Sequence, residues 1–319
     1  MRFSEQLRLF LRPSWTVQAS NDTGSSLHRP ESTTLGVQPI HKVLQFASST
    51  YYAIKSRIPS DRSLRDKELT ITQLHKDNYS VYGLRKLWAE LKRQGIDIAR
   101  CRTSRLMGDL GICGVRRGKT YVTTTISNEL KERPKDLVKR AFTAPAPNRL
   151  WVADITYVKT RVGWAYSAFL VDVYSRMIVG WKVSAHLRSD LATDALEMAV
   201  ASRGCVFDGL VHHSDRGVQY LSVTYSQALL DAGIAPSVGT TGDSYDNALS
   251  ESNNALYKAE MVRPKSGFNG TADLEWAILL SVDWFNNRRL HGSIGMIPPS
   301  EFEANYYTQR AFENRSVLK

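Results

Sequence analysis

LWVADITYVKT, residues 150–160, is an apolar run with a single acid, Asp154, inside it. Two further apolar runs follow in close succession, WAYSAFLVDVY at 164–174 and MIVGWKVSA at 177–185. Three strand-like runs joined by such short connections predict an antiparallel meander. The interior of a strand is an awkward place for an acid with only a structural purpose, so Asp154 is a candidate functional residue.

After residue 185 the pattern changes to an alternation of helices and strands. We expect a helix at 189–203, a strand at 210–215, a helix at 220–233, a strand at 235–239 and a long helix at 246–262. Ser189 is expected to cap the first of these helices, and Gly233 to end the second. The whole pattern predicts an α/β fold, a mixed sheet with flanking helices.

The charge is divided unevenly along the 319 residues, whose formal net charge is +11. Residues 1–140 contain 26 Lys and Arg against 13 Asp and Glu, whereas the rest of the chain contains 16 against 18. The first part therefore favours a polyanionic partner, although a solvated charged face would give the same count.

Composition also bears on the cellular compartment. No apolar run approaches the roughly 20 residues of a membrane helix, and the opening MRFSEQLRLFLRPSW lacks a signal-peptide core with a cleavage site. We therefore expect a cytoplasmic protein with no membrane partner. The three cysteines, Cys101, Cys113 and Cys205, favour reduced thiols by their odd number and wide spacing.

The basic first part has the pattern of a helix-turn-helix. YGLRKLWAELKRQ, residues 82–94, and ARCRTSRLMGDLG, residues 99–111, predict two helices, and two shorter helical stretches precede them between residues 40 and 57. The first helix has an apolar stripe of Leu84, Leu87, Trp88 and Leu91. In the second helix, Leu106, Met107 and Leu110 are expected to pack inward.

Cationic side chains of this first part are the candidate DNA contacts. They are Arg85, Lys86, Arg100, Arg102, Arg105, Arg116 and Arg117. A short helix with several arginines after a tight turn is suited to the major groove. Amphipathic basic helices also occur in proteins that never touch DNA, and the sequence does not decide which arginines read bases.

Three acids of the second part can converge. Asp154 lies in the first strand, Asp215 ends the fourth strand in HHSDRGVQY, and Glu251 lies in the last helix. Convergent carboxylates repel one another unless a cation neutralises them, and hard divalent ions with oxygen ligands are suited to this. Taken alone, Asp215 is more consistent with a turn former, and Glu251 with a surface residue.

The last helix adds two more candidates to the face of Glu251. Asn247 lies four positions before this glutamate and Lys258 seven positions after it, so helical geometry places all three on one stripe. A carboxylate, an amide and a cation on one stripe could bind a metal and a phosphodiester side by side.

Several of these motifs together resemble a known family. WVADITY, VDVYSRMIVGW, HHSDRGVQY and GDSYDNALSESNNALYKAE are similar to the catalytic core of the DDE transposases and retroviral-type integrases. More narrowly, they resemble the second-reading-frame transposase of the insertion-sequence-three family. Sixty residues separate Asp154 from Asp215 and thirty-five separate Asp215 from Glu251, and the second interval names the family motif. Lys258 matches the family's cation seven positions after the glutamate.

The resemblance covers roughly residues 37–308, because DWFNNRRLHGSIGMIPPSEFE also resembles the family's closing segment and YGLRKLW its helix-turn-helix. It divides the chain into five expected parts. These are a poorly ordered lead-in (1–36), a helix-turn-helix DNA-binding region (37–113), a basic linker (114–146), an integrase-like catalytic core with a C-terminal helical segment (147–308) and a tail (309–319).

The resemblance implies a ribonuclease-H-like fold in which Asp154, Asp215 and Glu251 bind two Mg²⁺ or Mn²⁺ ions. It implies cleavage at the ends of a mobile element, after which the freed 3′-hydroxyl attacks another DNA strand. Lys258 would contact DNA phosphate and Asn247 would support the site. Asp172, Asp243 and Asp246 lie near these motifs but do not have the matching spacing, and His212 and His213 are not expected as ligands.

Partners also follow from the resemblance. They are the terminal inverted repeats of the element and target DNA, with a homo-oligomer assembled on them in the bacterial nucleoid. Family members are commonly fused by frameshift to an upstream reading-frame product; since this chain has no heptad repeat, that product is a candidate partner. His41, His75, Cys101 and Cys113 occur in the order of the retroviral zinc domain, but eleven residues separate the cysteines, so we expect no zinc.

The sequence is also consistent with two other hypotheses about function. One is a non-catalytic DNA-binding regulator that occupies element ends and competes with an intact enzyme. The other is a ribonuclease-H-like nuclease that cuts DNA but does not join it. Metal-dependent cleavage separates the regulator from both enzymes, and joining to a second duplex separates the transposase from the nuclease.

Overall fold

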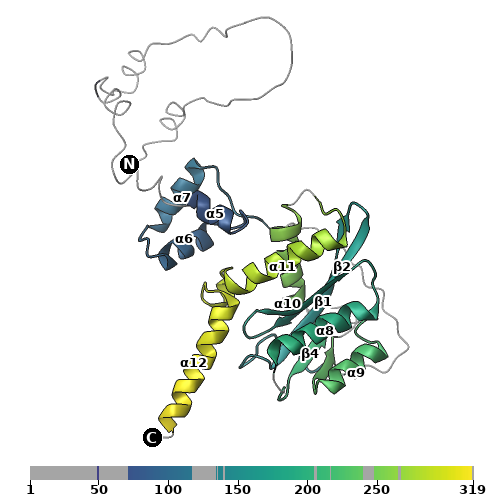
Figure 1. Ribbon diagram of the computed structural model, residues 1–319. Helices are drawn as coiled ribbons and strands as arrows, with labels where there is room; N and C mark the ends of the chain where they lie inside the picture. The colour runs from purple at the N-terminus through teal and green to yellow at the C-terminus, as the bar shows by residue number, and fades with distance from the viewer. Residues whose placement is uncertain are drawn as a thin grey trace, which may run out of the picture. The chain divides into compact units, whose positions relative to one another are not determined.

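The computed structural model describes residues 71–116, 134, 136–138, 141–204, 207–215, 217–239, 248–264 and 267–317, together with residue 49. Its centre is a five-stranded sheet in the order β3-β2-β1-β4-β5 (Figure 1). The strands are β1 (Leu150–Thr160), β2 (Gly163–Asp172), β3 (Ile178–Ser184), β4 (Val211–Ser214) and β5 (Ala235–Val238). The first three pair antiparallel, and β4 and β5 join them in parallel. The predicted meander and mixed sheet are therefore confirmed.

Both faces of the sheet are buried, and side chains along each strand alternate between them. In β1, Trp151 and Ala153 belong to one apolar cluster, whereas Leu150 and Val152 belong to another. Helices α8 (Ser189–Arg203) and α9 (Val223–Asp231) supply the first cluster. Helices α10 (Ala248–Tyr257) and α11 (Thr271–Asn287), with the π-helical turn η2 (Lys258–Val262) between them, lie on the other face.

The contact between β3 and α8 depends on one glycine. A Cβ atom on Gly180 would lie 2.1 Å from the carbonyl oxygen of Ala195 and 2.8 Å from the Cβ of Ala199. Real atoms do not approach so closely, so only glycine lets the strand and the helix pack at this separation. The small residues of α8 and the glycine of β3 thus fix the position of the helix over the sheet.

Between residue 71 and the sheet, the described residues form the helices α5 (Ile71–Asp77), α6 (Leu84–Arg93) and α7 (Arg100–Asp109). The last two lie where the sequence predicts them. On the apolar stripe of α6, Leu87 and Leu91 are completely buried, and the flanking Leu84 and Trp88 are partly buried against the same cluster. The expectation that Leu110 packs inward is wrong, because α7 ends at Asp109 and Leu110 is 49% exposed in the turn that follows.

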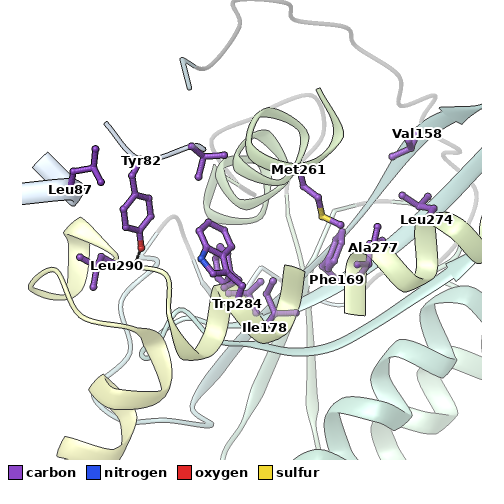
Figure 2. Close-up of a cluster of buried hydrophobic side chains, with 14 of the residues drawn as sticks. Tyr82, Leu87, Val158, Phe169, Ile178, Met261, Leu274, Ala277, Trp284 and Leu290 are labelled. Atoms are coloured by element: carbon purple, nitrogen blue, oxygen red, sulfur yellow. Dashed lines mark hydrogen bonds between the residues drawn. The ribbon is translucent and has the colours of Figure 1, made fainter. Parts of the chain in front are cut away.

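These helices and α11 contribute to one hydrophobic cluster, which Figure 2 shows around Trp284 (Figure 2). Polar groups at its border are also paired. The hydroxyl of Tyr82 accepts a hydrogen bond from the backbone N–H of Leu290 at 2.8 Å. The indole N–H of Trp284 donates to the side-chain oxygen of Asn78 at 3.0 Å. All described residues from Ile71 onward belong to one compact unit.

Two expectations about the helices need correction. Ser189 is the first residue of α8 and not its cap, because the capping position falls on Arg188 and no side chain accepts a capping hydrogen bond there. The long helix expected at 246–262 changes into the π-helical turn at Lys258. The stretches at 40–57, apart from residue 49, and most of the linker at 114–146 lie outside the described residues.

The chain continues after α11 through a short 3-10 turn, η3 (Gly292–Ile294), into α12 (Pro299–Val317). This helix crosses the expected boundary at residue 308 without a break. It is polar along most of its length. Within the described ranges, no helix is both long enough and apolar enough to cross a membrane.

Candidate active site

The pairing of β1 with β4 places two of the predicted acids next to each other. The parallel register runs from Leu150 opposite Val211 to Ala153 opposite Ser214. The next residue on each strand is an aspartate, Asp154 on β1 and Asp215 after β4. Because paired residues of neighbouring strands point to the same face, both carboxylates lie on the face that α10 covers.

Backbone amides hold both aspartates. Asp154 Oδ1 accepts the N–H of Ile155 at 2.9 Å. Asp215 Oδ1 accepts the N–H of Gly217 at 2.9 Å, which folds the chain into a turn directly after the strand. The turn-forming role considered for Asp215 is therefore real, and it fixes the side chain beside Asp154.

The electrostatics of the site are dominated by buried negative charge. Burial, followed by the charge of Asp215, raises the pKa of Asp154. Burial also raises the pKa of Asp215. The pKa of Glu251 is raised by partial burial and then by Asp215. The three carboxylates therefore interact, and each is easier to protonate than an isolated carboxyl group.

Helix α10 supplies an amide that sequence reasoning missed. Asn254 donates from Nδ2 to Asp154 Oδ2 at 2.8 Å, and the rest of its side chain is buried. It lies three residues after Glu251 and four before Lys258, so it belongs to the stripe on which both were predicted. Its spacing from Glu251 and Lys258 could therefore have identified Asn254 as a candidate site residue from the sequence.

The glutamate itself stands apart from the two aspartates. Glu251 is exposed in the first turn of α10. Among the described residues, no group of three His, Cys, Asp or Glu side chains is close enough to hold a metal ion. Residues 240–247, which precede α10 and include Asn247, Asp243 and Asp246, lie outside the described residues.

Lys258 lies close to the aspartates. Its Nζ lies over the ring of Tyr157 at 4.6 Å from the centroid. Burial lowers the pKa of Lys258, and the charge of Asp154 opposes that change. A partly buried ammonium group is thus held within the electrostatic reach of the carboxylates.

Comparison with known proteins places this geometry in a family. Integrase core domains match residues 144–244 and 232–299, and an HTH-like domain matches residues 61–120. A relative from insertion sequence element IS986/IS6110 of Mycobacterium tuberculosis (strain CDC 1551 / Oshkosh) is 50% identical over 273 residues, covering 84% of this chain and 98% of the relative. The transposase for insertion sequence element IS629 of Shigella sonnei is 46% identical over 279 residues, covering 85% of this chain and 93% of that one.

The chain belongs to the insertion-sequence-three family of DDE transposases. It is a polynucleotidyl transferase whose function is DNA cleavage and transposition, and its partner is DNA. Together with the strand order, the integrase core domain confirms the predicted ribonuclease-H-like fold. Among solved structures, the HTLV-2 integrase catalytic core domain in complex with magnesium is 16% identical, with a TM-score of 0.40 over 50% of this chain and 99% of that one.

The other polar residues near the site of this transposase have structural partners. His212 Nε2 and the hydroxyl of Tyr225 are 2.8 Å apart, and His213 Nδ1 and the hydroxyl of Ser237 are 2.9 Å apart. Asp172 is fully buried at the end of β2, where it accepts hydrogen bonds from the backbone N–H groups of Asn148 and Ser175. The buried polar groups of these three residues therefore have hydrogen-bond partners within the protein.

The predicted DNA contacts of this transposase differ in their accessibility. Arg85, Arg100, Arg105 and Arg116 are exposed, and Arg102 is partly buried. Lys86 lies 3.6 Å from Glu260, with its ammonium group over the ring of Tyr82. Its charge is thus already engaged within the protein. Arg117 lies outside the described residues.

Proposed function

We propose that Asp154, Asp215 and Glu251 are the catalytic acids of this transposase and that together they bind two Mg²⁺ or Mn²⁺ ions. The observation that carries the proposal is the β1–β4 register, which brings two aspartates from distant parts of the sequence side by side. Burial and mutual repulsion raise the pKa values of the two adjoining carboxylates, and a bound cation would favour their fully ionised form. An all-oxygen donor set suits hard divalent ions.

Bound there, such ions would activate water or a DNA 3′-hydroxyl and stabilise the departing oxygen, as paired metals do in phosphoryl transfer. The protein's own groups have complementary tasks. Asn254 holds Asp154 in a fixed orientation through its 2.8 Å hydrogen bond. Glu251 lies in the first turn of α10 and interacts electrostatically with Asp215, which helps to raise its pKa. Lys258 would contact a phosphate beside the scissile bond.

The DNA substrates in this proposal are the terminal inverted repeats of the mobile element and a target duplex. The exposed arginines of α7 and its surroundings would bind the element end, because their guanidinium groups can contact phosphates and base edges. Since two ends must be joined to one target, the active form would be a homo-oligomer assembled on DNA. The upstream reading-frame product remains a candidate additional partner.

The test is a strand-transfer assay with purified protein, labelled element-end DNA and Mg²⁺, in which wild type is compared with Glu251→Gln. We expect joined product from wild type, and a decrease of at least roughly 100-fold in the variant, because the amide cannot offer the same charge to a metal. Glu197→Gln is the matched control, since Glu197 is exposed on α8, on the other face of the sheet.

Each outcome decides between the candidate functions. Binding to element ends without cleavage by wild type would indicate a regulator or a chain that needs its upstream partner, and adding that partner separates these two. Cleavage without joining would indicate a nuclease. Normal joining by Glu251→Gln would contradict the assignment of this residue.

A further inference from the structure

The hairpin that joins β1 and β2 carries an exposed aromatic pair. Trp164, near the start of β2, is 52% exposed, which is unusual for so large an apolar side chain. Its ring packs perpendicular to that of Tyr157 on β1, with centroids 5.4 Å apart and an interplanar angle of 81°. The two rings therefore support each other while much of the indole faces solvent.

Cations surround this aromatic pair. Lys258 Nζ lies 4.6 Å from the centroid of the Tyr157 ring. The strand register places the exposed Lys159 directly opposite Trp164, and Arg161 lies in the turn between the strands. No acid occurs between residues 155 and 171. An exposed aromatic surface in a hairpin whose charged residues are all positive is complementary to a nucleic acid, which offers both base faces and phosphates, and not to a basic partner.

The aromatic pair is also close to the carboxylates. Tyr157 follows Asp154 by three residues on the same strand, which corresponds to about 10 Å along β1, and this odd interval assigns the two side chains to opposite faces of the sheet. Lys258 Nζ nevertheless lies over the Tyr157 ring, so the ring is within reach of groups from the α10 face. Lys258, which covers Tyr157, lies one helical turn after Asn254, and Asn254 is hydrogen-bonded to Asp154. Pairing of β1 with β4 runs only to Ala153, so among the described strands the part of β1 that carries Tyr157 has β2 as its one hydrogen-bonded neighbour.

We propose that Trp164 and Tyr157, with Lys258 and Lys159, form a binding site for an unpaired nucleotide of the DNA, next to the phosphate that reacts at the carboxylates. The base stacks on the indole of Trp164, and the two ammonium groups bind the adjoining phosphates. The placement of this site beside the scissile phosphate rests on the proposed catalytic role of Asp154. A separated end nucleotide held in this way keeps the DNA strands apart near the reacting bond.

Binding can be tested without catalysis. The probe is an element-end duplex that carries 2-aminopurine in an unpaired overhang next to the cleavage position, mixed with protein in the absence of divalent metal. Stacking on an aromatic ring quenches 2-aminopurine fluorescence, so wild type should quench the signal. Trp164→Leu keeps an apolar side chain against Tyr157 but removes the aromatic face, and we expect it to lose the quenching and to bind the overhang about 10-fold more weakly.

Two further variants separate stacking from a general disturbance of the hairpin. Trp164→Phe retains an aromatic face and should restore most of the quenching. Val162→Ala is the matched control, because Val162 is 81% exposed in the turn of the same hairpin and should leave quenching unchanged. Thermal unfolding of each variant identifies any that fail to fold. If Trp164→Leu fails to fold, the comparison of wild type with Trp164→Phe still tests whether the aromatic ring at this position binds the base.

The outcomes are distinct from those of the catalytic test. Equal quenching by wild type and Trp164→Leu would overturn this proposal, whatever the strand-transfer result. A change in oligomer mass for Trp164→Leu, with quenching intact, would also overturn it and indicate a protein contact. Loss of quenching together with an intact Trp164→Phe response would support it even if metal-dependent joining were absent, in which case the catalytic proposal alone would fail.

Discussion

At the scale of single residues, the site combines groups that are costly to bury with groups that hold them in place. Asp154 and Asp215 each accept a backbone N–H, and Asn254 donates a second hydrogen bond to Asp154. These hydrogen bonds favour the ionised carboxylates, whereas burial and mutual repulsion oppose ionisation. The aspartates are thus positioned for a charge that the protein by itself compensates only in part.

The adjoining histidines lead to a prediction about pH. Burial, followed by the neighbouring His213, lowers the pKa of His212 from 6.5 to about 3, and its Nε2 lies 2.8 Å from the hydroxyl of Tyr225. His212 therefore stays neutral in the folded protein, while the unfolded chain takes up a proton below about pH 6.5. The free energy of unfolding should fall as the pH decreases through this range, by about 2 kcal/mol from this group between pH 7 and pH 5.

The measurement is urea unfolding of wild type and His212→Gln at pH 7 and pH 5, without metal. Glutamine keeps a polar partner for Tyr225 but does not titrate. We expect wild type to lose about 2 kcal/mol more than the variant between these pH values. Parallel losses in the two proteins would show that His212 does not control acid sensitivity.

At the scale of elements, the π-helical turn η2 links the face of α10 that carries Glu251 and Asn254 to the helices that precede the sheet. Its first residue, Lys258, covers Tyr157. Two residues later, Glu260 makes two hydrogen bonds of 2.6 Å to the guanidinium group of Arg289 and lies 3.6 Å from Lys86 of α6. Burial alone would raise the pKa of Glu260, but Arg289 and Lys86 together lower it.

The ion pairs that Glu260 makes with Arg289 and with Lys86 should contribute very different amounts to the free energy of unfolding. Arg289 is 3% exposed, so Glu260→Gln would leave a buried guanidinium group without its counter-charge, and we expect a loss of about 3 kcal/mol in the free energy of unfolding. Lys86→Met should cost less than about 1 kcal/mol, because this longer, partly exposed ion pair is weaker and the methionine still packs on Tyr82. Urea unfolding of both variants at pH 7 provides the comparison; a larger effect of Lys86→Met would contradict it.

Local pattern predicted the elements well and their long-range contacts less well. The bounds of β1 and α8 coincide with the predicted segments because apolar periodicity is a property of neighbouring residues. The proximity of Asp154 and Asp215 was also expected, because the first and fourth strands of the predicted mixed sheet can be neighbours. By contrast, nothing near Lys86 in the sequence indicates that its partner is Glu260, which lies 174 positions later. Glu260 belongs to the π-helical turn η2, where the hydrogen-bond pattern of the preceding α-helix changes.

At the scale of the whole molecule, the uneven distribution of charge predicts a division of tasks between two parts of the chain. Residues 1–140 carry an excess of 13 positive charges, and the remainder carries an excess of 2 negative charges. Phosphate contacts by exposed arginines supply affinity, and each one releases counterions from DNA. The part of the chain that contains the carboxylates is nearly neutral, so general attraction to DNA should depend on the first part.

The salt dependence of DNA binding is the corresponding prediction. The slope of log K against log salt concentration should become less steep by about 1 for each phosphate contact removed. Arg100 and Arg105 are exposed on α7, so the double variant Arg100→Ala, Arg105→Ala should lose about 2 from the slope measured by fluorescence anisotropy on an element-end duplex. Lys182→Ala is the control, because Lys182 lies on β3 and pairs with Asp194 of α8 at 3.4 Å.

If both variants kept the wild-type slope, DNA attraction would have to come from other cations of the first 140 residues, and α7 would be a structural helix. If Lys182→Ala changed the slope as much as the double variant, the division of tasks by charge would itself be wrong, because the nearly neutral part would then contribute phosphate contacts of its own.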